Sequence, residues 1–108
     1  MKSILKITLL IFLLYSCEYN YEENPINTDC TDTEISFIET IKPIIDNNCL
    51  NCHNGDEPPN LSTYEEIKAD TEEIQEDVFH RIMPSDRRLS NQDIEAIYCW
   101  IENGAPNN

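Results

Sequence analysis

The sequence Cys49-Leu50-Asn51-Cys52-His53 restricts the fold of this chain more than any other feature. A pair of cysteines separated by two residues occurs in redox-active thiols and in zinc sites, so the pair alone selects no single chemistry. The expected folded part has roughly 75 residues, a size that buries a modest core and often needs a metal, a disulfide or a cofactor to stabilise it. The cysteine motif is therefore expected to hold such a group.

The histidine that directly follows Cys52 narrows the choice, because C-x-x-C-H is the signature for covalent attachment of c-type haem. In that chemistry both thiols add to the haem vinyl groups, and the spacing of three places the two sulfurs along one edge of the porphyrin. His53 then supplies the proximal nitrogen to iron. The motif predicts one haem c bound covalently by Cys49 and Cys52, with His53 as a ligand of the metal.

The second iron ligand is predicted to be Met83. It is the only methionine once Met1 has left with a leader, and Pro84 follows it at the expected end of a helix. The alternative role for such a methionine is core packing. His80, the only other histidine, is an alternative ligand or a surface residue. Two axial ligands leave iron no open position, which indicates an electron carrier rather than an enzyme.

Residues 1–16 have the pattern of a bacterial lipoprotein signal peptide. Two lysines precede an apolar run over 7–14 that is too short to span a bilayer as a helix of about 20 residues. The following Leu14-Tyr15-Ser16-Cys17 resembles a lipoprotein box, which implies cleavage before Cys17 and lipidation of that cysteine. An uncleaved anchor or an ordinary signal is the alternative. The expected location is the periplasm, the outer membrane or the cell surface, with a lipid anchor in the membrane.

The chain is strongly acidic, with 21 Asp and Glu against 7 Lys and Arg and a formal charge of −14. Cleavage before Cys17 removes two lysines and no acid, which gives −16. Such a surface repels nucleic acid, and it favours redox partners with basic docking surfaces or simple solvation. Residues 17–33 have few apolar side chains and are expected to form an acidic flexible tether, followed by a folded domain over 34–108.

Capping residues and apolar periodicity predict an all-α fold of about four short helices without strands. Capping boxes begin two of them, Ser36 with Glu39 and Ser62 with Glu65. The expected helices are 36–48, 62–69, 70–83 and 90–103, of which the third begins after Asp70 and ends at Met83-Pro84. Their predicted inward faces are Ile38, Ile41 and Ile45 in the first helix, Ile74, Val78 and Ile82 in the third, and Ile94, Ile97, Tyr98 and Ile101 in the last.

The order of these motifs resembles class I cytochrome c domains, in particular the short ones of exported bacterial lipoproteins. The shared elements are a helix containing proline, the haem motif, Pro59-Asn60-Leu61, Met83-Pro84 and Trp100-Ile101-Glu102-Asn103-Gly104-Ala105. The resemblance implies a cytochrome c-like fold around one covalent haem, in which the first and last helices cross. It also implies that the Pro59 carbonyl accepts a hydrogen bond from His53 and that Leu61 packs on the haem. Ser85-Asp86-Arg87-Arg88 departs from the family, which often has proline and glycine there.

Counting the cysteines leaves one unassigned pair. Cys17 is expected to carry lipid, and Cys49 and Cys52 are expected to carry haem. Cys30 and Cys99 remain, and an even pair in an oxidising compartment predicts a disulfide between them. Two free thiols, with Cys99 buried, are the alternative.

Two other functions fit parts of the sequence. A structural zinc module would use Cys49, Cys52 and His53 with Cys30 or Cys99, but it gives no role to Met83-Pro84. A haem-based sensor would release Met83 and bind a small ligand in its place. Near the expected ligand loop, Arg81, Arg87 and Arg88 could neutralise a haem propionate, orient a partner or simply be solvated. Monohaem electron transfer accounts for most of the motifs.

Overall fold

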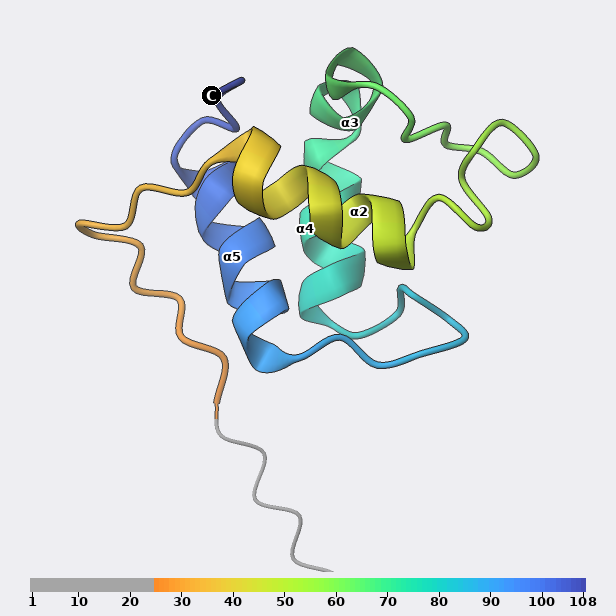
Figure 1. The fold of residues 1–108 in the computed structure, drawn as a ribbon. Helices are drawn as coiled ribbons and strands as arrows, with labels where there is room; N and C mark the ends of the chain where they lie inside the picture. The colour runs from red at the N-terminus through yellow and green to blue at the C-terminus, as the bar shows by residue number, and fades with distance from the viewer. Residues whose placement is uncertain (1–24) are drawn as a thin grey trace, which may run out of the picture.

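The computed structural model describes residues 25–108; the predicted signal peptide, Cys17 and the first part of the tether lie outside this range. The elements are a π-helical segment η1 (Phe37–Ile41) and the α-helices α2 (Lys42–Asn48), α3 (Tyr64–Ala69), α4 (Thr71–Phe79) and α5 (Asn91–Glu102) (Figure 1). Residues 25–108 contain no strand, which confirms the predicted all-α class for this part. Within the same range, no helix is long and apolar enough to cross a membrane.

The first helical stretch begins where the sequence predicted. The Ser36 hydroxyl accepts a hydrogen bond from the backbone N–H of Glu39 at 3.1 Å, which satisfies one of the free donors at the helix start. The backbone then changes from π to α geometry beside Pro43, a residue that has no N–H to donate. The stretch ends at Asn48, so α2 leads directly into the cysteine motif.

The first and last helical stretches cross, as the resemblance implied (Figure 1). Aromatic rings pack at this crossing. The rings of Phe37 and Trp100 are stacked with their centroids 5.6 Å apart, and Tyr64 meets Phe37 edge-on at 5.1 Å. The indole N–H of Trp100 donates to the carbonyl of Pro106 at 3.0 Å, so its one polar atom is satisfied although the side chain is buried. This crossing forms one end of the core and fixes the direction in which α2 leaves it.

Two residues of the predicted core are on the surface instead. Ile38 is 63% exposed, because the buried face of this stretch begins at Phe37 and continues four residues later with Ile41. Ile82 is 56% exposed, because α4 ends at Phe79 and not at Met83. Arg81 has a φ of +57°, which the α-helix does not allow, so the 3.6-residue period stops before Ile82.

The beginnings of α3 and α4 also differ from the prediction. The capping box of α3 consists of Thr63 and Glu66, one residue later than expected, while the Ser62 hydroxyl donates to the side chain of Asn60 at 2.6 Å. Asp70 precedes α4 as predicted, but its side chain makes no capping hydrogen bond. In α5 the Ser90 hydroxyl caps the backbone N–H of Asp93, and Ile94 and Ile97 are buried, as predicted; Tyr98 and Ile101 are half-buried.

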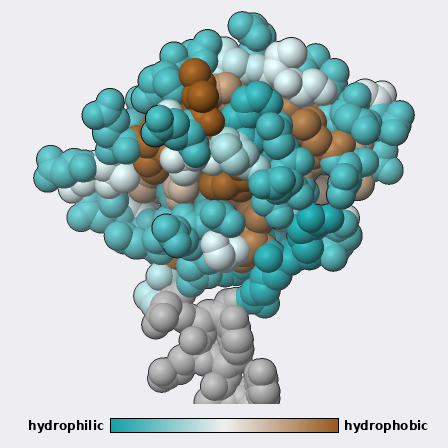
Figure 2. All heavy atoms as spheres, viewed as in Figure 1, coloured by the Kyte–Doolittle hydropathy of each residue, from teal (hydrophilic) through white to brown (hydrophobic). Residues whose placement is uncertain are grey.

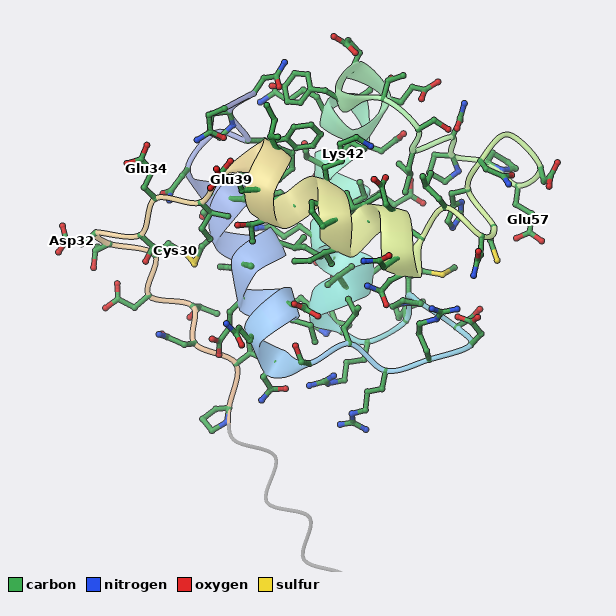
Figure 3. The ribbon with its side chains drawn as sticks, in the orientation of Figure 1. Cys30, Asp32, Glu34, Glu39, Lys42 and Glu57 are labelled. Carbon is green, nitrogen blue, oxygen red and sulfur yellow. A yellow bond between two sulfur atoms is a disulfide. The ribbon has the colours of Figure 1, made fainter. Side chains whose placement is uncertain are left out.

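Most of the face seen in Figure 2 is hydrophilic, interrupted by separate hydrophobic areas. Acidic side chains point outward from the segment before η1 and from the loop after the cysteine motif, as Figure 3 shows for Asp32, Glu34 and Glu57. The acidic composition therefore corresponds to a solvated surface around a small core.

Candidate functional site

Hydrogen-bonded turns, outside α2, carry the chain through the cysteine motif. The N–H of Cys49 donates to the carbonyl of Ile45 at 2.8 Å, and the N–H groups of Cys52 and His53 donate to the carbonyl of Cys49 at 3.2 and 3.0 Å. Side chains three and four positions apart lie on one side of such a turn. Cys49, Cys52 and His53 therefore project from the same side of the chain at the end of α2, as joint attachment to one flat group requires.

The loop after the motif folds back and holds the imidazole of His53. Its Nδ1 lies 3.0 Å from the carbonyl oxygen of Pro59 and 3.2 Å from that of Glu57. The N–H of Leu61 returns to the carbonyl of His53 at 2.8 Å, and Gly55 allows the turn with a φ of +112°. The hydrogen bond between His53 and Pro59, implied by the resemblance, is present.

An apolar cavity of about 120 Å³ lies at the end of α2, between the motif and the Met83 loop. Cys49, His53, Pro59, Leu61 and Met83, all predicted site residues, line it. The structure therefore brings together both predicted iron ligands, one predicted thioether cysteine and both predicted pocket residues.

A second, smaller hollow of about 50 Å³ adjoins the apolar cavity and is lined by Cys52 together with Cys49, His53 and Met83. The two hollows share these last three side chains, so the unfilled space continues past them on the side of Cys52. Met83 is 39% exposed, and its N–H donates to the carbonyl of Asp77 at 3.2 Å. The loop that carries Met83 is thus attached by its backbone to α4, while the Met83 thioether remains at the cavity.

Seven further residues line the apolar cavity and were not predicted as part of the site: Ile45, Pro58, Glu73, Ile74, Asp77, Val78 and Ile97. The four apolar helix residues among them were predicted to face inward: Ile45, Ile74, Val78 and Ile97. Apolar periodicity alone does not distinguish a face that packs in the core from one that lines a cavity. Glu73 and Asp77 are four residues apart, as are Ile74 and Val78, so each pair forms a row along α4. The acidic row directly beside the apolar row could have been predicted to border the cavity. Glu73 and Asp77 add two carboxylates to an otherwise apolar wall.

Burial raises the pKa of the Cys49 thiol to about 11, and the charge of nearby Arg87 acts in the opposite direction. Arg87 donates to the carbonyl of Asn47 at 3.0 Å, near the end of α2, and pairs with Asp86 at 3.1 Å. It therefore joins the ligand loop to the helix that carries the cysteine motif. Arg81 donates to the carbonyl of Leu89 at 3.1 Å and to the side chain of Asn91.

Cys30 and Cys99 form the predicted disulfide, with an S–S distance of 2.07 Å and a Cα–Cα distance of 5.1 Å (Figure 3). Both sulfurs that the zinc alternative required as a fourth ligand are used in this bond. Between residues 25 and 108, no group of three or more His, Cys, Asp and Glu side chains is arranged to hold a metal ion. The disulfide thus ties the segment before η1 to α5.

His80, the alternative iron ligand, does not line the apolar cavity. Its ring is exposed, lies 3.2 Å from a carboxylate oxygen of Glu76 and meets Phe79 edge-on. These contacts hold it on the outer side of the end of α4. Met83 is therefore the better-placed ligand of the two.

Comparison of the chain with protein-family models, with curated proteins and with solved structures finds no match at the level of significance applied.

Proposed function

We propose that this protein is a monohaem c-type cytochrome that carries electrons outside the cytoplasm. The observation that supports this most is the apolar cavity that Cys49, His53 and Met83 line together. His53 and Met83 are 30 residues apart in sequence and come from separate loops, so their meeting at one cavity is a tertiary feature and not a consequence of the motif. The chemistry of this donor set, one imidazole, one thioether and two thiols, fits a covalently attached haem.

Each residue has a separate task in this proposal. Cys49 and Cys52 would hold the group through thioether bonds, and His53 and Met83 would bind its iron. Haem supplies a one-electron couple at iron, and the protein adjusts the potential of this couple. The carbonyl of Pro59 fixes the His53 ring and leaves Nε2 available as the ligand.

The side chains around the cavity keep water away from the metal. Leu61 is 5% exposed and Val78 is 4% exposed, and both line the cavity with Ile45 and Ile97. A dry, apolar surrounding and a methionine ligand both raise the reduction potential. Because His53 and Met83 would both be used to hold the iron, the proposed function is electron transfer and not catalysis at the metal.

The proposal extends to the location of the protein. Lipid on Cys17 would hold the domain at a membrane through the tether, and haem attachment and disulfide formation both take place outside the bacterial cytoplasm. The Cys30–Cys99 disulfide supports an oxidising compartment.

The pyridine haemochrome spectrum of denatured protein tests the proposal. The chain is produced in cells that carry a c-type haem maturation system, and we expect one haem per chain that stays with the denatured polypeptide. A Cys49→Ala/Cys52→Ala variant is the matched control and should lose the covalent haem. Wild-type protein that carries no haem after denaturation would falsify the proposal.

A further inference from the structure

The loop that carries Met83 is a basic region on an acidic protein. Residues 25–108 contain five Lys and Arg, and three of them, Arg81, Arg87 and Arg88, lie in this loop. Residues 80–92 contain a single acid, Asp86. The formal charge of this segment is therefore +2, although that of the whole chain is −14.

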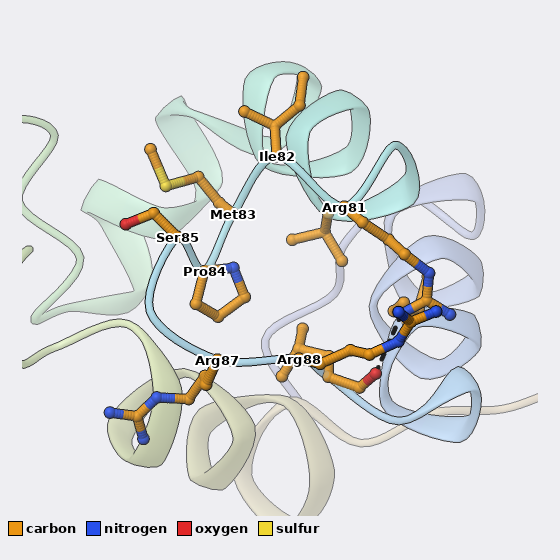
Figure 4. Close-up of a pocket in the computed structure, with 10 residues that line it drawn as sticks. Arg81, Ile82, Met83, Pro84, Ser85, Arg87 and Arg88 are labelled. Atoms are coloured by element: carbon orange, nitrogen blue, oxygen red, sulfur yellow. Dashed lines mark hydrogen bonds between the residues drawn. The ribbon is translucent and has the colours of Figure 1, made fainter.

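Apolar surface accompanies this charge. A hollow of about 350 Å³ opens in the loop and is lined by the three arginines together with Ile82, Met83 and Pro84 (Figure 4). Ile82 is 56% exposed, one of three large hydrophobic side chains so exposed among the described residues. Figure 4 shows Arg81 and Arg88 reaching to one side of the loop and Arg87 to the other. Cations thus lie on both sides of an exposed apolar centre.

The loop is also next to the candidate site. Met83 lines this hollow and both hollows at the cysteine motif. Arg87 contacts the carbonyl of Asn47, two residues before Cys49. An electron that leaves the site near Met83 therefore leaves through the basic surface.

We propose that loop 81–88 is the docking surface for a redox partner that presents carboxylates around an apolar contact. This rests on the proposed electron-transfer function and names the partner chemistry that goes with it. Charges more than about 8–10 Å apart are screened at physiological ionic strength, so charges at the contact count for more than the distant acids. The net charge of the whole chain predicted partners with basic surfaces. The positive charge of this loop favours partners with acidic surfaces instead.

Acidic side chains also border the two hollows at the cysteine motif, so a route past them is the alternative. Glu73 and Asp77 line the apolar cavity from α4, and Glu57 lines the smaller hollow. Electron exit past these carboxylates would select a cationic partner. The sign of the charge that an approaching reagent meets separates the two routes.

Oxidation of the reduced holoprotein by hexacyanoferrate(III), a small anionic probe, tests the proposal. The second-order rate constant is measured from about 100 mM to about 1 M ionic strength, a range over which the screening length falls from about 10 to about 3 Å and distant acids stay screened. As the ionic strength rises, we expect the rate constant to fall at least about twofold, because salt screens the attraction of the probe to the loop. If the net charge governed the encounter, salt would screen a repulsion and the rate constant would rise. The cationic probe tris(phenanthroline)cobalt(III) should give the opposite slope. A rate constant for hexacyanoferrate(III) that rises or stays flat overturns the proposal.

Two double variants test whether the arginines of this loop cause the dependence on ionic strength. Arg87→Gln/Arg88→Gln should reverse the slope for hexacyanoferrate(III), and Lys42→Gln/Lys68→Gln, which removes the same charge elsewhere, should preserve its sign. The same reversal in both double variants would overturn the assignment to this loop. A chain without covalent haem contradicts the proposed function, whereas a haem-bearing chain with the wrong slope contradicts the docking surface alone.

Discussion

The imidazole Nδ1 of His53 lies 3.0 Å from the carbonyl oxygen of Pro59, a residue six positions further along the chain. The carbonyl of Glu57, at 3.2 Å, is its other neighbour, and both are acceptors. The ring must therefore carry its proton on Nδ1, which leaves the lone pair on Nε2. The chain thus selects the tautomer that a metal ligand needs before any metal is bound.

The first prediction concerns this tautomer. In haem-free protein at about pH 8, we expect His53 to be the Nδ1–H form, because only this form can donate to the carbonyl of Pro59. The ¹⁵N chemical shifts of the two ring nitrogens distinguish the tautomers. His80 is the internal reference, since its Nε2 faces Glu76 instead. A His53 ring that is mainly Nε2–H would contradict the geometry.

The second prediction concerns Met83. Met83→Ala should abolish the ferric methionine–iron charge-transfer band and lower the reduction potential, because a thioether ligand stabilises the reduced state. The variant should also bind carbon monoxide in the ferrous state, whereas the wild-type protein should not. Rapid binding of carbon monoxide by the wild type would favour the small-ligand sensor instead.

A neighbouring substitution provides the control for Met83. Ile82→Ala changes an exposed side chain of the same loop and should leave the band in place. If Met83→Ala also leaves the band and the potential unchanged, Met83 is not a ligand.

Local features of the site and the fold could be predicted from the sequence. Ser36 and Ser90 cap helices because their hydroxyls reach a backbone N–H three residues on, within the same short segment. The cysteine motif projects its side chains together because the spacing of three and four matches a helical turn. The Cys30–Cys99 pair followed from counting cysteines.

Features that depend on distant contacts could not be predicted. Phe37, and not Ile38, lies on the buried face of the first stretch, where its ring stacks on Trp100 of the last helix. The end of α4 follows from the positive φ of Arg81, whose guanidinium bonds to Leu89 and Asn91 across the loop. The contact between Arg87 and Asn47 joins residues 40 positions apart. Each depends on the tertiary structure of the ligand loop or of the helix crossing.

The third prediction concerns the disulfide, which joins residues 69 positions apart. Cys30→Ser/Cys99→Ser should lower the free energy of unfolding by on the order of 4 kcal/mol in the chain-entropy model, because the unfolded chain regains the freedom of a long loop. Urea denaturation measures the change. A reducing agent should destabilise the wild type and leave the double variant unaffected. If thiol labelling without reductant modifies Cys30 or Cys99, the bond is not formed in solution.

The fourth prediction concerns the start of α3. Thr63→Ala should destabilise the protein by about 1 kcal/mol, because the Thr63 hydroxyl accepts the backbone N–H of Glu66. Ser62→Ala is the matched control and should cost less, because that hydroxyl bonds to Asn60 and not to the helix. Denaturation of both variants measures the difference. The reverse order would show that the helix begins one residue earlier, as the sequence pattern suggested.

The fifth prediction concerns Cys49 before haem is attached. Its pKa of about 11, against an ordinary value of 9.0, leaves about a hundredfold less thiolate at pH 8 than an exposed cysteine has. In haem-free Cys52→Ser protein, alkylation of Cys49 should become about tenfold faster per pH unit from pH 8 to 10 and level off near 11, since only the thiolate reacts. Arg87→Gln should move this plateau to higher pH, because its cation favours the thiolate. The same protein unfolded in urea should reach the plateau near pH 9, and a folded protein that also does so would show that Cys49 is not buried.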